Sequence, residues 1–501
     1  MKRAWVAALA FVLAWPMTAS AEKVLRVGLT GLPPAKGNPY FTTGTTPYTF
    51  FTAMYDPLVQ IDDAGVAHPW LALEWQPANP TTWIISLRPG VTFSNGEPFN
   101  AEAVKVSFDF LLSDAAILQT VSRDIDFISG VRALDDMTVE ITTKTPNIFM
   151  PRYLAGVNIV APKQFTRLGL DGFANEPVGT GPFKVDSWDP EKIELSAFRG
   201  SWRPPKVDRM EALALPEAVT RIQALETRRV DVATNIQPDD VDRLRELGMR
   251  FHKRNPTRVM VVSFDVIKEG SPFKDARVRR AMNYGVNRQA IVDGLLHGLT
   301  QATSQPAAPA AVGHVPDIKP YPYDPAKAKA LLAEAGYPNG FSVIMEQAGG
   351  QLANDAAVAQ QIAADLALIG VKMEIQTITF PQVVKAMTVG PWKGYALATD
   401  YATAPSLDMM RAFNRHSCSW TAPWFCDPAI EPKIAEADAT FDAARRTQLT
   451  QEIVRHYHEV ASALFLYPAV SLDGLSPRVT RWEPWNDNFM YHLADVSEEK
   501  P

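Results

Sequence analysis

The chain has 501 residues, of which 47% are hydrophobic and 21% are charged, and its formal net charge is −6. This length predicts two to four domains with room for more than one hydrophobic core. The mild acidity, without any long run of like charges, argues against a nucleic acid or an anionic membrane as the partner.

Residues 1–21 have the pattern of a secretory signal peptide. Lys2 and Arg3 precede an apolar core at 4–15, and the small residues at 19–21 form a cleavage site that leaves Glu22 first in the mature chain. This core is shorter than the roughly 20 apolar residues that a membrane anchor needs. No cysteine follows the leader, which excludes a lipid anchor there. We therefore expect a soluble protein in an exported, oxidising compartment.

The first part of the mature chain predicts strands, loops and a capped helix. Residues 24–29 predict a buried strand, and a loop rich in Gly, Pro and Thr follows at 31–47. The segment 81–114 contains a strand, a turn at Asn95-Gly96 and a helix that Asn100 is placed to cap.

Residues 178–210, with the sequence VGTGPFKVDSWDPEKIELSAFRGSWRPPKVDRM, predict a glycine-rich turn followed by two strands. Gly179 and Gly181 allow backbone conformations closed to other residues, and Pro182 disfavours a helix. A phosphate-binding loop needs a helix N-terminus after its glycines, whereas a strand follows here. We interpret the segment as structural scaffold.

The second half alternates helices with strands, which predicts α/β architecture. Two helices are expected to begin at side-chain caps, one at Asn287 and one at Asp324 with Pro325 in the first helical position. The predicted elements are two short helices within 271–298, a helix at 324–336, a helix at 358–369, a strand at 371–378 and a helix at 449–460.

Motifs for catalysis are missing from the sequence, which contains no G-x-S-x-G, H-E-x-x-H or P-loop pattern. His456 and His458 lie two residues apart on a predicted helix and so point to different sides. Asp239 and Asp240 precede a predicted helix and suit capping. We predict that the protein is not an enzyme. An exported hydrolase is the alternative of another class, and a ligand-sensing partner of a receptor is a third.

The two cysteines, Cys418 and Cys426, lie close together in the segment HSCSWTAPWFCDP. In an oxidising compartment we expect a disulfide that closes this short loop. A metal site built from His416 and both thiolates is the alternative, although structural zinc usually has four protein ligands.

The order GTGPF, hairpin, R-G-x-W and PKVD within 178–210 resembles the bacterial extracellular solute-binding proteins of family 5. These are the periplasmic peptide-, opine- and nickel-binding components of ABC importers. The block LRPGVTFSNGEPFNAEAVKVS within 81–114 resembles the same family. Similar blocks occur in the family's order along essentially the whole mature chain. The resemblance implies periplasmic capture of a small solute, an ABC permease of the inner membrane as partner, a monomer, and no cofactor. A local cysteine pair like this one occurs in some peptide-binding members, which favours the disulfide.

The resemblance also implies an α/β, two-lobed periplasmic binding protein of type II, in the large cluster with an extra subdomain and a ligand cleft between the lobes. The chain should cross between the lobes twice, near 259–266 and near 464–476. The family usually has Asn where Asp265 stands. The expected division is a signal peptide at 1–21, lobe I at 22–56, 178–262 and 477–501, an extra subdomain at 57–177, and lobe II at 263–476.

Two regions commonly line the cleft in this family. One is the loop after the first strand, and the other follows the strand near residue 399. By resemblance, the ligand-binding candidates are Tyr40, Thr45, Thr46, Tyr48, Asp400 and Tyr401.

The second region departs from the family at one position. Peptide-binding members carry an aromatic residue followed three residues later by an Asp that pairs with the ammonium group of the peptide. If Tyr401 is the aromatic, Ala404 stands where this Asp belongs, and only a gapped match lets Asp400 take its place. Capture of a free peptide N-terminus is therefore in question.

The nickel-binding branch supplies a second hypothesis. The segments PWLA and FSNGEPF look like that branch, which places a histidine downstream of the cleft aromatic, and His416 matches it loosely. A single imidazole holds a metal poorly unless the metal arrives already chelated. We predict a receptor for a peptide-like or other small polar organic solute, with a nickel or metal chelate as the alternative.

Overall fold

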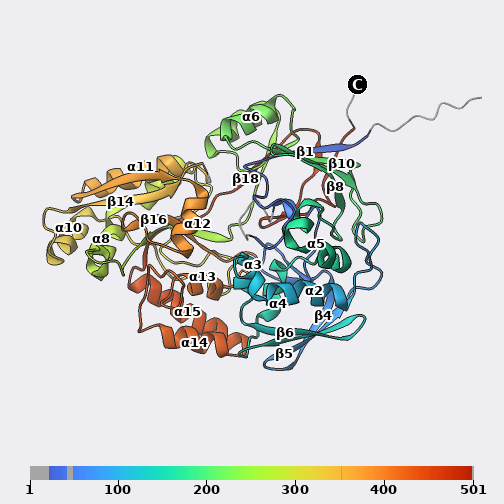
Figure 1. The fold of residues 1–501 in the computed structure, drawn as a ribbon. Helices are drawn as coiled ribbons and strands as arrows, with labels where there is room; N and C mark the ends of the chain where they lie inside the picture. Colours follow the sequence, from blue (N-terminus) through green and yellow to red (C-terminus); the bar gives the residue numbers. More distant parts are fainter. Residues whose placement is uncertain (1–21, 42–48, 351, 499–501) are drawn as a thin grey trace, which may run out of the picture.

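The computed structural model describes residues 22–41, 49–350 and 352–498. The predicted signal peptide and three of the candidate ligand residues, Thr45, Thr46 and Tyr48, lie outside the described residues. Helices and strands alternate through most of the chain (Figure 1). Within the described residues, the strands form two large sheets, a four-stranded sheet and three two-stranded pairs. The α/β class expected from the sequence is confirmed.

Lobe I is built on a seven-stranded sheet with the strand order β12-β18-β11-β1-β10-β9-β8. Strand β1 lies in its centre and pairs in parallel with β10 and β11. Its elements are β1 Val24–Leu29, β8 Phe183–Trp188, β9 Lys192–Ala197, β10 Arg209–Ala214, α6 Ala218–Glu226, β11 Val232–Ala233, α7 Val241–Glu246, β12 Arg250–Lys253 and β18 Leu472–Leu475. The C-terminal segment adds the pairs β19 Val479–Arg481 with β22 Asp495–Val496 and β20 Pro484–Trp485 with β21 Asn488–Phe489.

The extra subdomain contains a four-stranded antiparallel sheet with the order β4-β5-β7-β6 and helices packed beside it. Its buried residues, such as Val139, share one core with those of lobe I, such as Val27. Its elements are β2 Val59–Ile61, β3 Ala67–Pro69, β4 Ala72–Asn79, β5 Thr82–Leu87, α2 Ala101–Leu111, α3 Thr120–Asp124, β6 Ile128–Asp135, β7 Thr138–Thr143, α4 Met150–Tyr153 and α5 Pro162–Asn175. The shared core makes the subdomain part of the first lobe.

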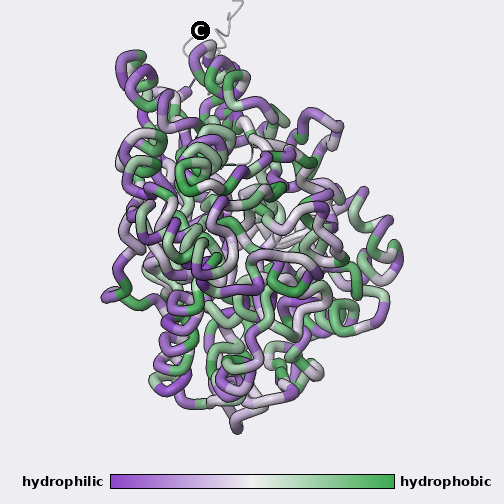
Figure 2. The backbone as a smooth tube through the Cα atoms, turned by 90° about the vertical axis from the view of Figure 1, so that its left-hand side faces the viewer, coloured by the Kyte–Doolittle hydropathy of each residue, from purple (hydrophilic) through white to green (hydrophobic). Residues whose placement is uncertain are grey.

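Lobe II is built on a five-stranded sheet with the order β15-β14-β16-β13-β17. Helices α8, α10 and α11 lie on one side of this sheet and α13, α14 and α15 on the other (Figure 1). The bounds are β13 Arg258–Phe264, α8 Ala276–Gly285, α9 Arg288–Ala290, α10 Pro325–Glu334, β14 Phe341–Ala348, α11 Asp355–Ala367, β15 Val371–Ile378, α12 Phe380–Thr388, β16 Ala396–Ala402, α13 Met409–Arg415, α14 Glu431–Ala439, α15 Ala443–Glu459 and β17 Ala463–Pro468. Peripheral helices alternate hydrophilic and hydrophobic residues along their turns (Figure 2).

Local sequence signals account for many of these elements. The side chain of Asn100 accepts a hydrogen bond from Ala103 N at the start of α2, and Asp324 accepts one from Lys327 N at the start of α10. Asn287 caps α9 in the same way. These three predicted caps are confirmed. A capping side chain satisfies backbone donors that a helix start would otherwise leave unpaired.

The chain passes twice between the two large sheets. It leaves the seven-stranded sheet after β12 at residue 253 and enters the five-stranded sheet at 258, and it returns between β17 and β18, at 469–471. The expected boundary at 262/263 falls within β13, and the one at 476/477 falls after β18. We therefore propose lobe I as 22–56, 178–254 and 472–498, the extra subdomain as 57–177, and lobe II as 257–468.

A fully buried carboxylate joins the two ends of the extra subdomain to lobe I. Asp56 accepts hydrogen bonds from Trp70 Nε1 at 2.6 Å, Thr180 Oγ1 at 2.7 Å, Trp202 Nε1 at 3.0 Å and Arg203 Nε at 2.6 Å. Three of these donors come from the segment 178–210. The segment that carries the family resemblance thus supplies most of the hydrogen bonds to one buried charge.

The two glycines of the same segment are required by a close approach of the backbone. A Cβ atom built on Gly179 would lie 2.0 Å from the carbonyl oxygen of Met54, and one on Gly181 would lie 2.5 Å from its carbonyl carbon. Thr180, held between them, reaches Asp56. The predicted role of residues 178–210 as structural scaffold agrees with this geometry.

We expect Asp56→Ala to lower the free energy of unfolding by about 3–5 kcal/mol, because the change leaves the buried Arg203 guanidinium without its counter-charge. Equilibrium unfolding in urea, followed by tryptophan fluorescence, measures this loss. Asp171→Ala is the matched control, because Asp171 is exposed on α5 and should change stability by less than about 0.5 kcal/mol. A similar effect of both changes would contradict the role assigned to Asp56.

Candidate ligand-binding cleft

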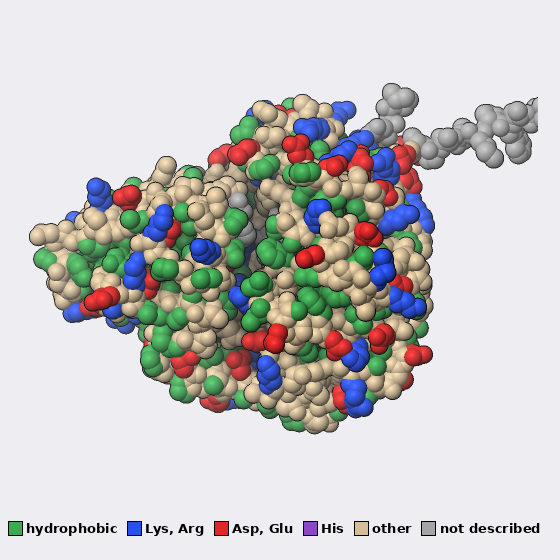
Figure 3. Space-filling view, viewed as in Figure 1, with side chains coloured by type: hydrophobic (Ala, Val, Ile, Leu, Met, Phe, Trp, Pro, Cys, Tyr) green, Lys and Arg blue, Asp and Glu red, His purple; other side chains and the backbone are tan. Residues whose placement is uncertain are grey.

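A cleft of about 660 Å³ lies where lobe I, the extra subdomain and lobe II meet. The groove between the two lobes is visible on the molecular surface (Figure 3). Its walls come from the residues that follow β1, from the region of α3, and from the five-stranded sheet with α11, α12 and α13. Sites for small organic molecules typically enclose about 300–1,000 Å³, so the cleft has the size of such a site.

Strand β16 supplies the centre of the lobe II wall. Ala398, Asp400 and Ala402 line the cleft, whereas Tyr401 belongs to the core on the opposite face of the sheet. This division follows from the alternation of side chains along a strand. Arg258 on the neighbouring strand β13 also lines the cleft, and its Nη1 donates to Asp400 Oδ2 at 3.3 Å. This part of the wall therefore carries an ion pair that faces the cleft.

Lobe I contributes residues from three separate parts of its chain. Thr30, Gly31 and Leu32 follow β1 directly, Asn235 follows β11, and Asp487 lies near the C-terminus. All five line the cleft. Their approach at one edge of the seven-stranded sheet is a product of the fold, because they are far apart in the sequence.

The fully buried guanidinium of Arg254 holds two of these residues in place. Arg254 lies in the first crossing between the lobes, and its Nη1 and Nη2 donate to Asp487 Oδ1 and Asn235 Oδ1, each at 2.5 Å. Asp487 Oδ2 also accepts from Thr257 Oγ1 at 3.0 Å. The first crossing between the lobes thus orients polar groups of the cleft.

Ion pairs join the extra subdomain to lobe II at one end of the cleft. Arg411 Nη2 on α13 donates to Asp124 Oδ2 at the end of α3, at 2.7 Å, and Arg415 Nη2 lies 3.6 Å from Asp124 Oδ1. Asp438 of α14 lines the same end, and burial raises the pKa of its carboxyl to about 7, while the nearby Arg446 opposes this change. Charged groups of both lobes therefore meet across the cleft.

Of the ligand-binding candidates predicted from the sequence, Asp400 and Tyr40 lie in different surroundings. Asp400 lines the cleft. Tyr40 is fully buried, stacks on Phe110 with 5.8 Å between ring centroids, and donates to the carbonyl oxygen of Asn158. Its ring anchors the loop to the lobe, which argues against direct contact with a ligand.

Tyr401 packs away from the cleft, which corrects the expectation that its ring faces a ligand. The side chain is fully buried, its ring lies 3.7 Å from that of His416, and its hydroxyl lies 3.2 Å from Ser462 Oγ. Asp400, the residue directly before Tyr401, faces the cleft instead. Ala404, which stands where the family's Asp was expected, does line the cleft.

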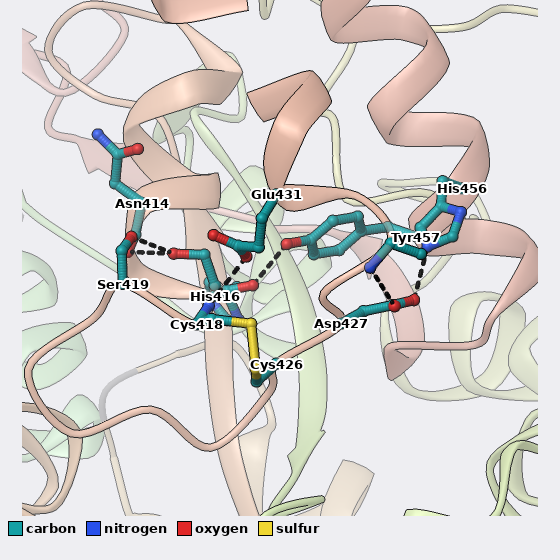
Figure 4. Close-up of a disulfide and its surroundings, with 11 residues drawn as sticks. Asn414, His416, Cys418, Ser419, Cys426, Asp427, Glu431, His456 and Tyr457 are labelled. Carbon is teal, nitrogen blue, oxygen red and sulfur yellow. Dashed lines mark hydrogen bonds and ion pairs between the residues drawn. A yellow bond between two sulfur atoms is a disulfide. The ribbon is translucent and has the colours of Figure 1, made fainter. Parts of the chain in front are cut away.

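The predicted disulfide between Cys418 and Cys426 is confirmed (Figure 4). Both sulfur atoms are therefore unavailable as thiolate ligands. His416, beside them, is almost fully buried, and burial lowers the pKa of its imidazole to about 3. The described residues contain no cluster of three or more His, Cys, Asp or Glu arranged to hold a metal ion. The alternative of a metal site at His416 is thus not supported.

Sequence reasoning missed the cleft residues that come from helix ends and distant loops. These are Arg123, Asp124, Asp126, Asn235, Arg411, Arg415, Asp438 and Asp487. None belongs to a local motif, and charged residues at helix ends normally face solvent. The packing of lobe I, the extra subdomain and lobe II against one another brings them together.

Comparison with known proteins identifies the family. Residues 66–419, more than half of the chain, match the family model described as bacterial extracellular solute-binding proteins, family 5 Middle. The chain belongs to this family. Among its relatives, the glutathione-binding protein GsiB of Pectobacterium atrosepticum is 26% identical over 523 residues, covering 99% of each chain. The family consists of solute-binding proteins of ABC importers and not of enzymes, so the exported hydrolase is not supported.

Solved structures show the same two-lobed fold. The periplasmic binding protein DppA from Helicobacter pylori, in complex with the peptide STSA, superposes with a TM-score of 0.84 and 23% identity, covering 96% of this chain and 99% of that one. NikA from Brucella suis, in complex with Fe(III)-EDTA, gives a TM-score of 0.82 and 22% identity, covering 95% and 100%. The two-lobed fold with a cleft is thereby confirmed.

The family is one of extracellular and periplasmic binding proteins. Across the described residues, we find no helix with the length and apolar character needed to cross a membrane.

The position of Tyr401 predicts an effect on stability. Tyr401→Ala should lower the free energy of unfolding by about 3 kcal/mol, because it opens a cavity among the rings of the lobe II core. Tyr401→Phe keeps the ring and should cost about 1 kcal/mol at most. Thermal and urea unfolding of both variants measure this difference. Equal stability of Tyr401→Ala and the natural protein would show that the ring is not part of the core.

The low pKa of His416 predicts a loss of stability in acid. In the unfolded chain this imidazole takes up a proton near pH 6.5, whereas in the folded protein its pKa is about 3. Its contribution is therefore present above pH 6.5 and is lost as the pH falls below that value. We expect His416→Phe to weaken the fall in melting temperature between pH 6.5 and about pH 4. Part of the fall should remain in this variant, because burial also lowers the pKa of His492 to about 3. An unchanged pH profile would contradict this assignment.

Proposed function

We propose that the protein is a periplasmic receptor that captures a peptide-like or other small polar organic solute by closure of its two lobes. It then delivers the solute to an ABC permease in the inner membrane. Export by the predicted signal peptide, cleaved after residue 21, belongs to the same proposal. The glutathione-binding and peptide-bound relatives support this solute class.

The observation that carries the proposal is the distribution of polar groups on both sides of one enclosed cleft. Asp400 and Arg258 lie on the lobe II wall, and Asn235 and Asp487 lie on the lobe I wall. The backbone passes between the two large sheets at two short crossings. A solute held between them can bind both lobes at once. Such binding favours the closed arrangement by the free energy of the contacts that only this arrangement makes.

The second hypothesis, uptake of a metal chelate, rests on the likeness to NikA in complex with Fe(III)-EDTA. His416 cannot act as the metal ligand while it is buried beneath Tyr401. A chelate whose metal is already fully coordinated would need only polar contacts to its organic part, and the cleft supplies these. The two hypotheses therefore differ in the solute and not in the site.

A panel of solutes tests both hypotheses. We expect one of the classes, namely dipeptides, oligopeptides, glutathione, opines or nickel chelates, to raise the melting temperature. A ligand at about 100 times its dissociation constant adds about 2.7 kcal/mol of stability. Asp400→Asn should reduce this rise, whereas Asp171→Asn, on the outer surface, should not. If no member of the panel changes the melting temperature, the proposed solute classes are wrong.

A further inference from the structure

The arginines of the cleft differ in whether their charge is already compensated. Four arginines line it, and three of them are ion-paired: Arg258 with Asp400, and both Arg411 and Arg415 with Asp124. Arg123 is the fourth. Across residues 22–41, 49–350 and 352–498, its guanidinium has no ion pair and no side-chain hydrogen bond. It is only partly exposed, so its charge faces the cleft rather than open solvent on all sides.

The carboxylates at this end of the cleft have other cationic neighbours. Asp124 pairs with both Arg411 and Arg415, and Asp438 lies 3.8 Å from Arg446. Asp126 also lines the cleft. Among the described residues, Arg123 is thus the cleft guanidinium that has no ion pair with a carboxylate.

Neutral polar groups of the extra subdomain line the cleft together with Arg123. Thr120 lies one turn earlier on α3, and Thr145 and Asn147 follow β7, and all three line the cleft. A guanidinium with neutral hydrogen-bonding groups in the same wall suits a planar anion that accepts two parallel hydrogen bonds. A carboxylate is planar and offers two such acceptor oxygens.

We propose that Arg123 binds a carboxylate group of the solute, so that the transported solute is an organic acid or a peptide with a free carboxyl group. The inference rests on the proposed function and adds the residue that recognises one end of the solute. Because Arg123 belongs to the extra subdomain and Asp400 to lobe II, the two would contact opposite ends of one solute across the cleft.

Calorimetric titration and thermal shift test the proposal with matched probes. The probes are glutathione, Leu-Leu and Ala-Ala-Ala, each beside the corresponding carboxamide, and inorganic phosphate serves as a general anion. We expect at least one carboxylated probe to bind. Arg123→Gln should weaken this probe at least about tenfold, because a charge-assisted hydrogen bond is lost, and Arg123→Lys should restore part of the affinity. The preference for the carboxylate over its carboxamide should disappear in Arg123→Gln.

Arg167→Gln is the matched control, because Arg167 is an exposed arginine on α5 of the same subdomain, outside the cleft, and should leave affinity unchanged. Unchanged affinity and carboxylate preference in Arg123→Gln would overturn the inference. Tighter binding of phosphate or of the carboxamides than of the carboxylates would overturn it too, while the role as a solute receptor would stand. If no probe, charged or neutral, binds the natural protein or raises its melting temperature, the inference fails together with the proposed solute class.

Discussion

The carboxylate of Asp56 is the constraint on which the arrangement of the first lobe depends. A charge that is fully buried must be paired and hydrogen-bonded, since leaving it alone in the protein interior costs several kcal/mol. Asp56 is the last residue of lobe I before the chain enters the extra subdomain, and Thr180 and Arg203 donate to it after the chain returns. Folding of the lobe therefore joins the entry and exit of the extra subdomain, which fixes the position of the wall that carries Arg123.

A second buried charge has the same effect at the crossing between the lobes. Arg254 is buried where the chain passes from one large sheet to the other, and it orients Asp487 and Asn235 at the edge of the cleft. One side chain thus ties the polar groups at this edge of the cleft to the crossing between the sheets. The extra subdomain also reaches lobe II directly, where Tyr153 donates to Asp408 at 3.1 Å.

Helix caps, strands and the glycine-rich turn could be predicted because their causes are local. Asn100 and Asp324 satisfy backbone donors within three residues. Along a strand such as β16, neighbouring side chains such as Asp400 and Tyr401 point to opposite faces. The sequence does not say which of the two faces the cleft, because both faces of the lobe II sheet are covered by helices and supply no contrast between water and core.

The sequence by itself determined the family, the α/β class, the disulfide and the structural role of residues 178–210, since each rests on short-range chemistry or on an ordered series of unlike residues. Only the tertiary structure decided that Tyr40 and Tyr401 belong to the core, that Asp124 is shared by two arginines of the other lobe, and that Arg123 has no ion pair within the described part of the chain. The physical reason is that charge compensation and burial depend on neighbours far away in the chain, and no local pattern records which neighbours these are.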